Sequence, residues 1–281
     1  MVELWSFAFV FMAGLITALA TGLGAIPFFF VAEVSDRWNV TLWGIASGIM
    51  LSASVFGLVL EALGTYIQVS LGGVSVSPIP QRQLLLLGVG LLSGVVLVYV
   101  AHDLIEAADV DPREYAEADF KKLVLILGVL TIHSFPEGVA VGVSFADLGL
   151  AGGTQIFGFV VPLLAIFMTI AISIHNVPEG VAISIPLRSM GVANWKLVWW
   201  SVFSSLPQPI GAVLAFYFVR VAREFLPAGF GFAAGAMIYL VLTEFIPEAL
   251  AVGKGLPGDG RRELLGGVAA GVLAMIPLAF V

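Results

Sequence analysis

The chain has 281 residues, of which 60% are hydrophobic and only 11% are charged, and its mean hydropathy is +1.07. Soluble globular domains carry roughly 25% charged residues, so this deficit excludes an ordinary soluble protein and indicates a polytopic membrane protein. The chain contains no cysteine, which excludes disulfides and thiolate metal ligands. The formal net charge of −7 gives no basic face, so we expect no nucleic-acid partner.

A helix needs ~20 mainly apolar residues to cross the hydrocarbon core of a bilayer. Eight stretches of the chain meet this requirement, near residues 4–32, 39–63, 83–107, 122–146, 156–187, 195–220, 226–251 and 263–281. We therefore predict an all-α, polytopic membrane protein with a single transmembrane domain over residues 1–281. Residues 108–121, which are rich in Asp, Glu and Ala, are expected to form the longest cytoplasmic loop.

The basic residues predict how the eight helices are oriented. An even number of spans places both termini on one side of the membrane. Loops on the opposite side hold nine basic residues, namely Arg37, Arg113, Lys121, Lys122, Arg188, Lys196, Lys254, Arg261 and Arg262. Loops on the side of the termini hold only Arg82, Arg220 and Arg223. Because Lys and Arg concentrate in cytoplasmic loops, we expect both termini to lie outside, in a plasma or inner membrane.

Prolines interrupt the predicted core helices. The fifth stretch contains Pro162, Pro178 and Pro186, and we expect it to bend or break because proline removes a helix hydrogen bond. In the sixth stretch Gln208 stands between two prolines, which indicates a locally opened backbone with a polar group aimed inward. Gln208 is then either a neutral oxygen ligand or a hydrogen-bond donor to a carboxylate. The fold prediction is thus a kinked, proline-interrupted core around the fourth and fifth helices.

Two near-copies of one motif lie in the fourth and fifth stretches. His133-Ser-Phe-Pro-Glu137-Gly is followed 42 residues later by His175-Asn-Val-Pro-Glu179-Gly. A histidine and a glutamate four residues apart share one face of a helix. Both copies fall near mid-depth, where insertion of a charge costs ~3 kcal/mol. A divalent cation between the two faces would neutralise both carboxylates, so we predict a metal site made by His133, Glu137, His175 and Glu179.

The paired motifs resemble the fourth- and fifth-helix signatures of the ZIP (Zrt-, Irt-like) divalent metal transporters, most closely the GufA-like and ZupT-like prokaryotic type. The resemblance also covers the eight spans, the outside termini and the Ser-x-x-x-x-Pro stretch of the sixth span. It implies that the chain is not an enzyme and that it moves a divalent transition metal into the cytoplasm. Zn²⁺ is the expected substrate, and Fe²⁺, Mn²⁺ and Cd²⁺ compete for similar ligands. The resemblance further implies that spans one, four, five and six move as a block against the other spans.

The resemblance also assigns roles to individual residues. The family's primary metal ligands match His133, Glu137, His175 and Glu179. Asn176 matches an Asn or Asp that often follows the second histidine, and Met50 matches a methionine that faces the primary site. Ser134 stands where many relatives have Asn, and Gln208 stands where many of the nearest relatives have Glu. Because both departures weaken ligands, we predict that a second, bridged metal position is weakened or absent.

Further polar residues lie near the cytoplasmic ends of two spans. The third span carries His102, Asp103 and Glu106, and the seventh carries Glu244 and Glu248. Two interpretations stay open for them. They form either an exit relay of weak metal sites or a hydrated interfacial face, which costs little near the lipid headgroups.

Two other functions remain as alternatives to metal transport, an intramembrane metalloenzyme, either a protease or a di-iron hydroxylase, and a proton-coupled carrier of a non-metal solute. An intramembrane metalloprotease would need H-E-x-x-H, with the glutamate as general base, and neither motif has it. A di-iron hydroxylase would need more histidines than the three in this chain. A proton-coupled carrier of a non-metal solute would use the His–Glu pairs as a proton relay, and it would need a roomy polar pocket.

The expected partners are divalent metal ions and the lipid bilayer. Small residues recur in the second span, for example Gly44 and Gly48, and in the third span, for example Gly90 and Gly94. Small residues let helix backbones approach closely in lipid. The helix faces that carry these small residues therefore indicate either a homodimer interface or internal helix packing.

Overall fold

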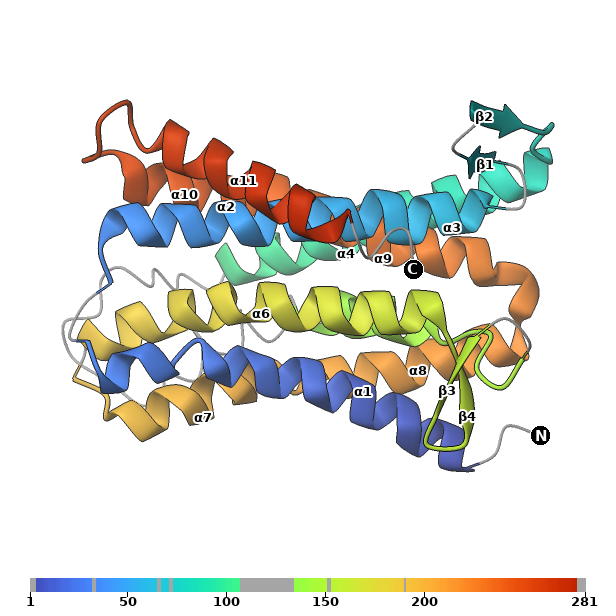
Figure 1. Cartoon of the computed structure of the whole chain (residues 1–281), viewed down its shortest axis with the longest axis horizontal. Coiled ribbons are helices and arrows are strands. Elements are labelled where there is room, and N and C mark those ends of the chain that lie inside the picture. Colours follow the sequence, from blue (N-terminus) through green and yellow to red (C-terminus); the bar gives the residue numbers. More distant parts are fainter. Residues whose placement is uncertain are drawn as a thin grey trace.

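The computed structural model describes residues 4–31, 34–64, 67–70, 73–106, 134–150, 153–189 and 191–276. The described chain is mostly helical (Figure 1). Its longer helices are α1 (Leu4–Leu23), α2 (Asp36–Ser52), α4 (Gln81–Glu106), α6 (Leu163–Ser189), α7 (Asn194–Ser204), α8 (Pro207–Val221), α9 (Leu226–Leu240), α10 (Ile246–Gly253) and α11 (Arg261–Met275). Residues 134–144 form a further helix, here called helix 134–144.

Shorter elements complete the described chain. Five short helical segments are η1 (Ile26–Phe29), η2 (Ala53–Val59), α3 (Leu60–Leu63), η4 (Arg223–Phe225) and η5 (Val241–Phe245). Two antiparallel hairpins are formed by β1 (Ile67–Ser70) with β2 (Gly73–Val76), and by β3 (Gly153–Ile156) with β4 (Phe159–Pro162).

Six helices among the described residues are long and apolar enough to cross a membrane. They are Leu4–Phe29, Asp36–Leu63, Gln81–Asp103, Leu163–Arg188, Asn194–Val221 and Arg223–Gly253. Helix 134–144 lies within the predicted fourth stretch, and α11 overlaps the predicted eighth stretch. The prediction of an all-α polytopic membrane protein is therefore confirmed. The predicted loop 108–121 and residues 122–133 of the fourth stretch lie outside the described residues.

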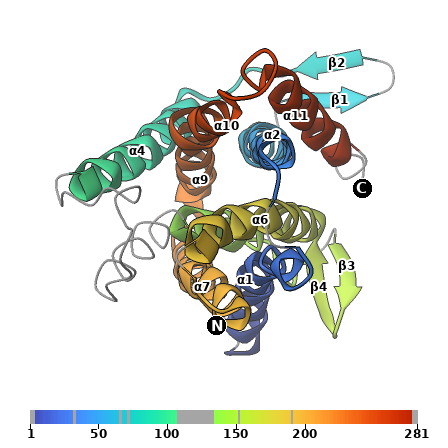
Figure 2. The ribbon, with the colours of Figure 1, turned by 90° about the vertical axis from the view of Figure 1, so that its left-hand side faces the viewer.

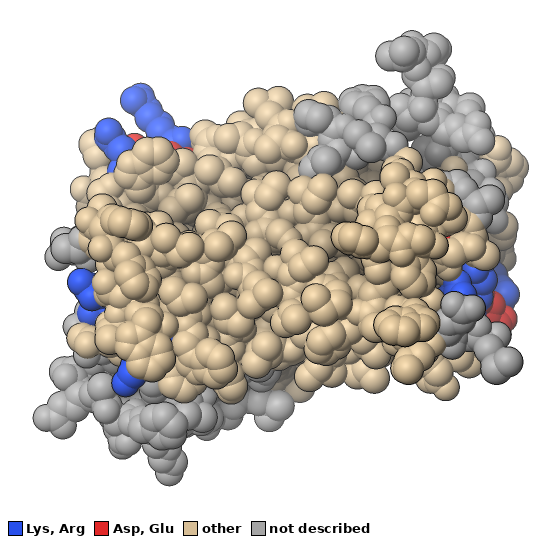
Figure 3. Space-filling view, turned by 60° about the horizontal axis from the view of Figure 1, so that its bottom comes forward, with Lys and Arg blue, Asp and Glu red and all other residues tan. Residues whose placement is uncertain are grey.

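The surface carries an apolar band between two charged ends. Figure 3 shows Lys, Arg, Asp and Glu side chains gathered at the two ends of the long axis, with other residues across the middle. Large hydrophobic side chains are exposed along this band, for example Leu214 on α8 and Leu92 on α4. A band of this kind faces the hydrocarbon of a bilayer, since water-exposed surfaces rarely carry contiguous apolar patches of such size.

The fifth predicted stretch differs from the structure at its start. The helix begins at Leu163 rather than near residue 156, because residues 153–162 form the hairpin β3–β4. The turn between the strands has positive φ at Phe157 and Gly158, which is typical of a tight two-residue hairpin turn. Pro162 ends β4 and has no N–H with which to extend the ladder.

The fifth span is not broken at its prolines, whereas the sixth span is open where Gln208 stands. Helix α6 continues without a break through Pro178 and Pro186. In the sixth span, α7 ends at Ser204 and α8 begins at Pro207, so the backbone opens immediately before Gln208. Proline within a membrane helix is tolerated when neighbouring elements satisfy the freed backbone groups. The locally opened backbone predicted at Gln208 is present.

The helices form two bundles, which are visible in Figures 1 and 2. The first bundle contains α1, helix 134–144, α6, α7 and α8. The second bundle contains α2 with η2 and α3, α4, α9 with η5, α10 and α11. Between the bundles, α2 and η2 pack on α6, and α9 approaches helix 134–144 where Gly229 faces Val143.

Glycines join helices closely inside each bundle. A Cβ atom at Gly180 would overlap the backbone carbonyl of Thr21, and one at Gly138 would overlap that of Gln208, both in the first bundle. In the second bundle, a Cβ atom at Gly90 would overlap the Ala228 carbonyl on α9. Gly44, Gly48, Gly90 and Gly94 thus serve internal packing, which removes them as an argument for a homodimer. Between the bundles the contact is different, because Gly57 on η2 faces flexible side chains of α6.

Candidate metal site

Three of the four predicted primary ligands meet in the interior of the first bundle. Glu137 lies on helix 134–144, and His175 and Glu179 lie on α6. All three are buried, and one ligand atom from each lies within 4.8 Å of the others. Nε2 of His175 is 3.2 Å from Oε1 of Glu137. The fourth predicted ligand, His133, lies outside the described residues.

The local sequence explains how these side chains converge. His175 and Glu179 are one helical turn apart on α6 and therefore share a face. Each glutamate is followed by a glycine, Gly138 or Gly180, that lets another backbone pass at close range. The backbone that passes Gly138 belongs to Gln208, and the one that passes Gly180 belongs to α1. The motif therefore supplies both the ligand and the space that encloses it.

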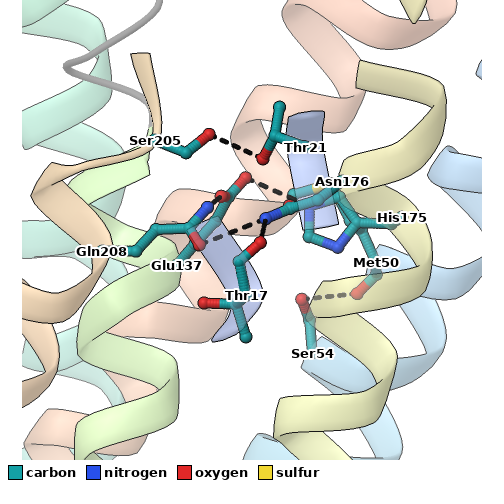
Figure 4. Close-up of polar contacts among 9 residues, drawn as sticks. All are labelled: Thr17, Thr21, Met50, Ser54, Glu137, His175, Asn176, Ser205 and Gln208. Carbon is teal, nitrogen blue, oxygen red and sulfur yellow. Dashed lines mark hydrogen bonds and ion pairs between the residues drawn. The ribbon is translucent and has the colours of Figure 1, made fainter. Parts of the chain in front are cut away.

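The side-chain amides of Gln208 and Asn176 form a chain of hydrogen bonds, here called the amide chain, that holds one carboxylate oxygen of Glu137 (Figure 4). Nε2 of Gln208 donates to Oε2 of Glu137 over 2.6 Å. Nδ2 of Asn176 donates to Oε1 of Gln208 over 3.1 Å and to the backbone carbonyl of Thr17 over 2.7 Å. Of the two roles left open for Gln208, the structure thus contains the hydrogen-bond donor to a carboxylate.

The opening between α7 and α8 places Gln208 in the interior. Pro207 and Pro209 have no N–H, so the first turn of α8 presents fewer unsatisfied donors than an ordinary helix start. The N–H of Gln208 donates to the Ser205 carbonyl over 3.0 Å. The Ser205 hydroxyl lies 2.8 Å from that of Thr21, which connects the opening to α1.

Several buried polar atoms of the cluster have no hydrogen-bond partner among the described residues. They are Nδ1 of His175, Oε2 of Glu179, Oδ1 of Asn176 and Oγ of Ser134. Leaving a buried polar atom unpaired costs about 1–3 kcal/mol. Nitrogen and oxygen atoms of these types are the ligands that zinc and its first-row neighbours take from proteins.

Met50 is fully buried on α2, in the second bundle, where α2 packs against α6. Figure 4 draws Met50 with Ser54, whose hydroxyl donates to the Met50 carbonyl over 2.7 Å. The π-helical segment η2 begins at Ala53, just after this methionine. A second π-helical segment, η5, contains Thr243, whose hydroxyl donates to the Tyr239 carbonyl.

The two π-helical segments were missed by the sequence analysis. Each contains a hydroxyl that donates to the carbonyl four residues back, a bond that can disturb a helix. The same bond occurs at Thr169, Ser173 and Ser184 in the uninterrupted α6, so it gave no distinctive signal. Single π-helical turns inside α-helices are frequent at functional sites. Here η2 follows Met50 and η5 carries Glu244, so both flank residues that the sequence analysis had selected.

The structure brings together part of the predicted exit relay. Nδ1 of His102 on α4 lies 3.2 Å from Oε1 of Glu244 on η5. Glu244 is also near enough to Glu179 for their charges to interact. Asp103 and Glu248 are exposed, and the side chain of Glu106 lies outside what the structure describes. Of the predicted relay, the structure thus brings His102 and Glu244 together, beside the buried cluster.

A cavity of about 210 Å³ opens at the end of the molecule where α1 begins. Its polar lining includes Glu61, Gln83, Ser144 and Asp147, contributed by both bundles. Asp147, which the sequence analysis did not select, forms an ion pair with Arg223. The cavity thus lies between the bundles at one end of the spans, whereas the ligand cluster is buried in the middle.

These observations define a polytopic helical membrane protein whose interior holds a Glu–His–Glu cluster able to hold a metal ion. Residues 106–279 match the family model for ZIP zinc transporters. The chain belongs to the ZIP zinc transporter family, as the paired motifs had indicated. Its members are transporters, which sets aside the intramembrane metalloenzyme considered above.

Several curated relatives resemble the chain. It is 39% identical over 233 residues to a putative zinc transporter of Arabidopsis thaliana, covering 83% of this chain and 33% of the plant protein. It is 30% identical over 240 residues to the zinc transporter GufA of Myxococcus xanthus, covering 85% and 87% of the two chains. It is 28% identical over 262 residues to the zinc transporter ZupT of Corynebacterium aurimucosum, covering 90% and 91%. The chain thus spans a third of the plant relative and most of the bacterial relatives.

Proposed function

We propose that this chain carries zinc, or a related first-row divalent cation, across the membrane by binding it at Glu137, His175 and Glu179. The proposal rests above all on one observation, the buried convergence of two carboxylates and an imidazole within 4.8 Å. A divalent cation there would offset both carboxylate charges, which are otherwise costly so far from water. His133, the remaining motif histidine, is proposed as the fourth ligand.

The spacing of the ligand atoms suits a small ion. Zinc binds nitrogen and oxygen ligands at ~2.0–2.2 Å with tetrahedral geometry, which places ligand atoms ~3.3 Å from one another. Nε2 of His175 and Oε1 of Glu137 are 3.2 Å apart, so an ion could bridge them after small movements. A non-metal solute would need considerably more room than a cluster of this size offers. Family membership and cluster size together favour a metal over an organic substrate.

We propose that the site holds one ion rather than two. Gln208 directs an amide N–H at Oε2 of Glu137, at the position where a carboxylate would otherwise offer a second cation a ligand. A hydrogen-bond donor there satisfies the glutamate oxygen and repels a cation. Asn176 holds the amide in this orientation by donating to its oxygen. The amide chain is therefore proposed to orient Glu137 for a single bound ion.

We propose that the two bundles move relative to each other during transport. Inside each bundle, glycines bring backbones into direct contact, and such joints resist rearrangement. Between the bundles, Gly57 faces the flexible side chains of Phe167 and Met168, which can repack. The cavity at Glu61 and Asp147 and the pair His102–Glu244 are proposed as the two approaches to the buried site.

The proposed orientation places both termini outside. The end of the molecule opposite the start of α1 carries Arg37, Arg188, Lys196, Lys254, Arg261 and Arg262, and the other end carries Arg82, Arg220 and Arg223. This bias supports a cytoplasmic location for the more basic end. The cavity at Glu61 and Asp147 would then open outward, and release through His102 and Glu244 would lead into the cytoplasm.

The direct test is zinc uptake into proteoliposomes. Glu137→Gln and His175→Ala should each abolish uptake, because each removes a ligand. Glu224→Gln is the matched control, since it makes the same chemical change at an exposed ion pair with Arg82. Uptake that stays at the wild-type rate in either site variant would disprove the assigned roles.

A further inference from the structure

The hairpin β3–β4 presents an aromatic side chain in an unusual backbone conformation. Phe157 has a φ of 49° and is 91% exposed, and Gly158 after it has a φ of 83°. Two-residue turns with positive φ at both positions favour Asn, Asp or Gly, and a bulky residue there is a clear exception. The conformation is thus unfavourable for phenylalanine, and the exposed ring gains little from the rest of the described chain.

The hairpin lies against the side of the first bundle. Figures 1 and 2 both show it beside the first turns of α1, at the edge of the molecule. The ring of Phe159 packs on Phe9 with centroids 5.0 Å apart, and Val161 is buried. Strand β3, in contrast, exposes Thr154 and Gln155. One strand is therefore held by the protein, and the tip projects beyond it.

The contact with Phe9 sets the depth of the tip. Helix α1 begins at Leu4, and at a rise of 1.5 Å per residue Phe9 lies roughly 7–8 Å along its axis. Trp5, in the first turn, is an exposed tryptophan of the kind found at membrane interfaces. Phe157, adjacent to the strand that packs on Phe9, thus lies at the level where α1 enters the apolar band.

We infer that Phe157 is a membrane anchor that inserts into the interfacial region of the bilayer. The occupant is lipid, because the tip lies on the outer surface of a membrane-spanning bundle at interfacial depth and no described residue covers it. Burial of the ring in lipid offsets the unfavourable turn conformation. The hairpin joins helix 134–144, which carries Glu137, to α6, which carries His175 and Glu179. The anchor would therefore hold the connection between the two site-bearing helices at a fixed level.

Site-directed spin labelling can test the anchor directly, because the native chain has no cysteine. Nitroxides are placed at Phe157→Cys, at Leu214→Cys as a lipid-facing reference and at Gly255→Cys as a loop reference, all in lipid nanodiscs. Leu214 is exposed on the middle of α8, and nothing lies within 4 Å of a Cβ at Gly255. The label at 157 should be more accessible to oxygen and less accessible to a water-soluble nickel chelate than the label at 255. Equal accessibilities at 157 and 255 would overturn the inference.

A second measurement asks whether the aromatic ring itself holds the hairpin. A nitroxide at Gln155→Cys reports on the hairpin in three backgrounds, with native Phe157, with Phe157→Trp and with Phe157→Asn. Asparagine suits the turn, so the hairpin should remain folded while the anchor is lost. Nickel accessibility at 155 should rise with asparagine and stay unchanged with tryptophan.

Two results would contradict the lipid assignment. An unchanged accessibility with Phe157→Asn would show that the ring does not hold the hairpin. A shift that disappears when the protein is diluted in lipid would assign the tip to contact with a second copy of the chain. Neither measurement depends on metal transport, so each stands apart from the proposed function.

Discussion

The substitution Gln208→Glu tests the role of the buried amide. In the native chain Nε2 of Gln208 donates to Oε2 of Glu137, and both side chains are fully buried. A glutamate of the same shape places a second carboxylate against the first. With the charge centres roughly 4 Å apart, their repulsion is about 4 kcal/mol at an effective dielectric constant of 20.

A second divalent cation would relieve this repulsion. Oδ1 of Asn176 and Oγ of Ser134 are buried without partners among the described residues, so additional ligands are close at hand. We therefore expect Gln208→Glu to raise the zinc content from one to two ions per chain. If the whole repulsion is relieved, the second ion binds up to about a thousandfold more tightly than in the native chain.

The assay is equilibrium dialysis of the purified protein against zinc, followed by elemental analysis, with cadmium competition as a second readout. Gln155→Glu is the matched control, because it makes the same chemical change at an exposed glutamine on strand β3, outside the cluster. A single ion per chain in Gln208→Glu, with unchanged preference between zinc and cadmium, would refute the argument.

Two further predictions concern release and packing. Glu244→Gln removes the charge beside His102. Zinc binding should persist, while uptake into proteoliposomes falls about tenfold, which corresponds to a rise of ~1.4 kcal/mol in the activation barrier for transport. An unchanged uptake rate would exclude a role of Glu244 in release. Gly180→Ala should destabilise the folded protein by about 1–3 kcal/mol, because the added methyl overlaps the Thr21 carbonyl. Gly266→Ala on α11, where nothing lies within 4 Å, should leave the melting temperature in detergent unchanged or slightly higher.

The predictable parts of the molecule follow from the length of its apolar stretches and from the residue spacing in a repeated motif. The length of each apolar stretch predicted the membrane helices, since crossing the hydrocarbon requires a fixed number of residues. The four-residue spacing of His175 and Glu179 placed both on one face of α6. Repetition of the motif then predicted that Glu137 would meet them, and the structure brings Glu137 within 3.2 Å of His175.

Other features depended on contacts that no single segment reveals. Residues 156–162 are as apolar as the helix after them, so hydropathy could not separate strand β4 from α6. Three prolines predicted a bend or break in the fifth span, yet Pro162 lies in β4 and α6 runs unbroken through the other two. The amide chain from Thr17 through Asn176 to Gln208 joins residues that are far apart in sequence, so it required the three-dimensional structure.

Movement of the bundles relative to each other can be tested with engineered cross-links, because the native chain has no cysteine to interfere. Gly57 on η2 and Met168 on α6 belong to different bundles, and a Cβ at Gly57 would lie 3.0 Å from Sδ of Met168. Cysteines at these two positions should form a disulfide on oxidation. If transport requires the bundles to slide, the cross-link should stop zinc uptake, and reduction should restore it.

The matched control is a cross-link inside the first bundle. The hydroxyls of Ser184 on α6 and Ser201 on α7 lie 3.4 Å apart, and both residues are buried. A disulfide between cysteines at these positions should leave uptake unchanged, because α6 and α7 are expected to move together. Full cross-linking of 57 to 168 with normal uptake would mean that the metal passes between stationary bundles. Loss of uptake with the 184–201 cross-link would mean that the first bundle itself deforms, which its glycine-joined backbones argue against.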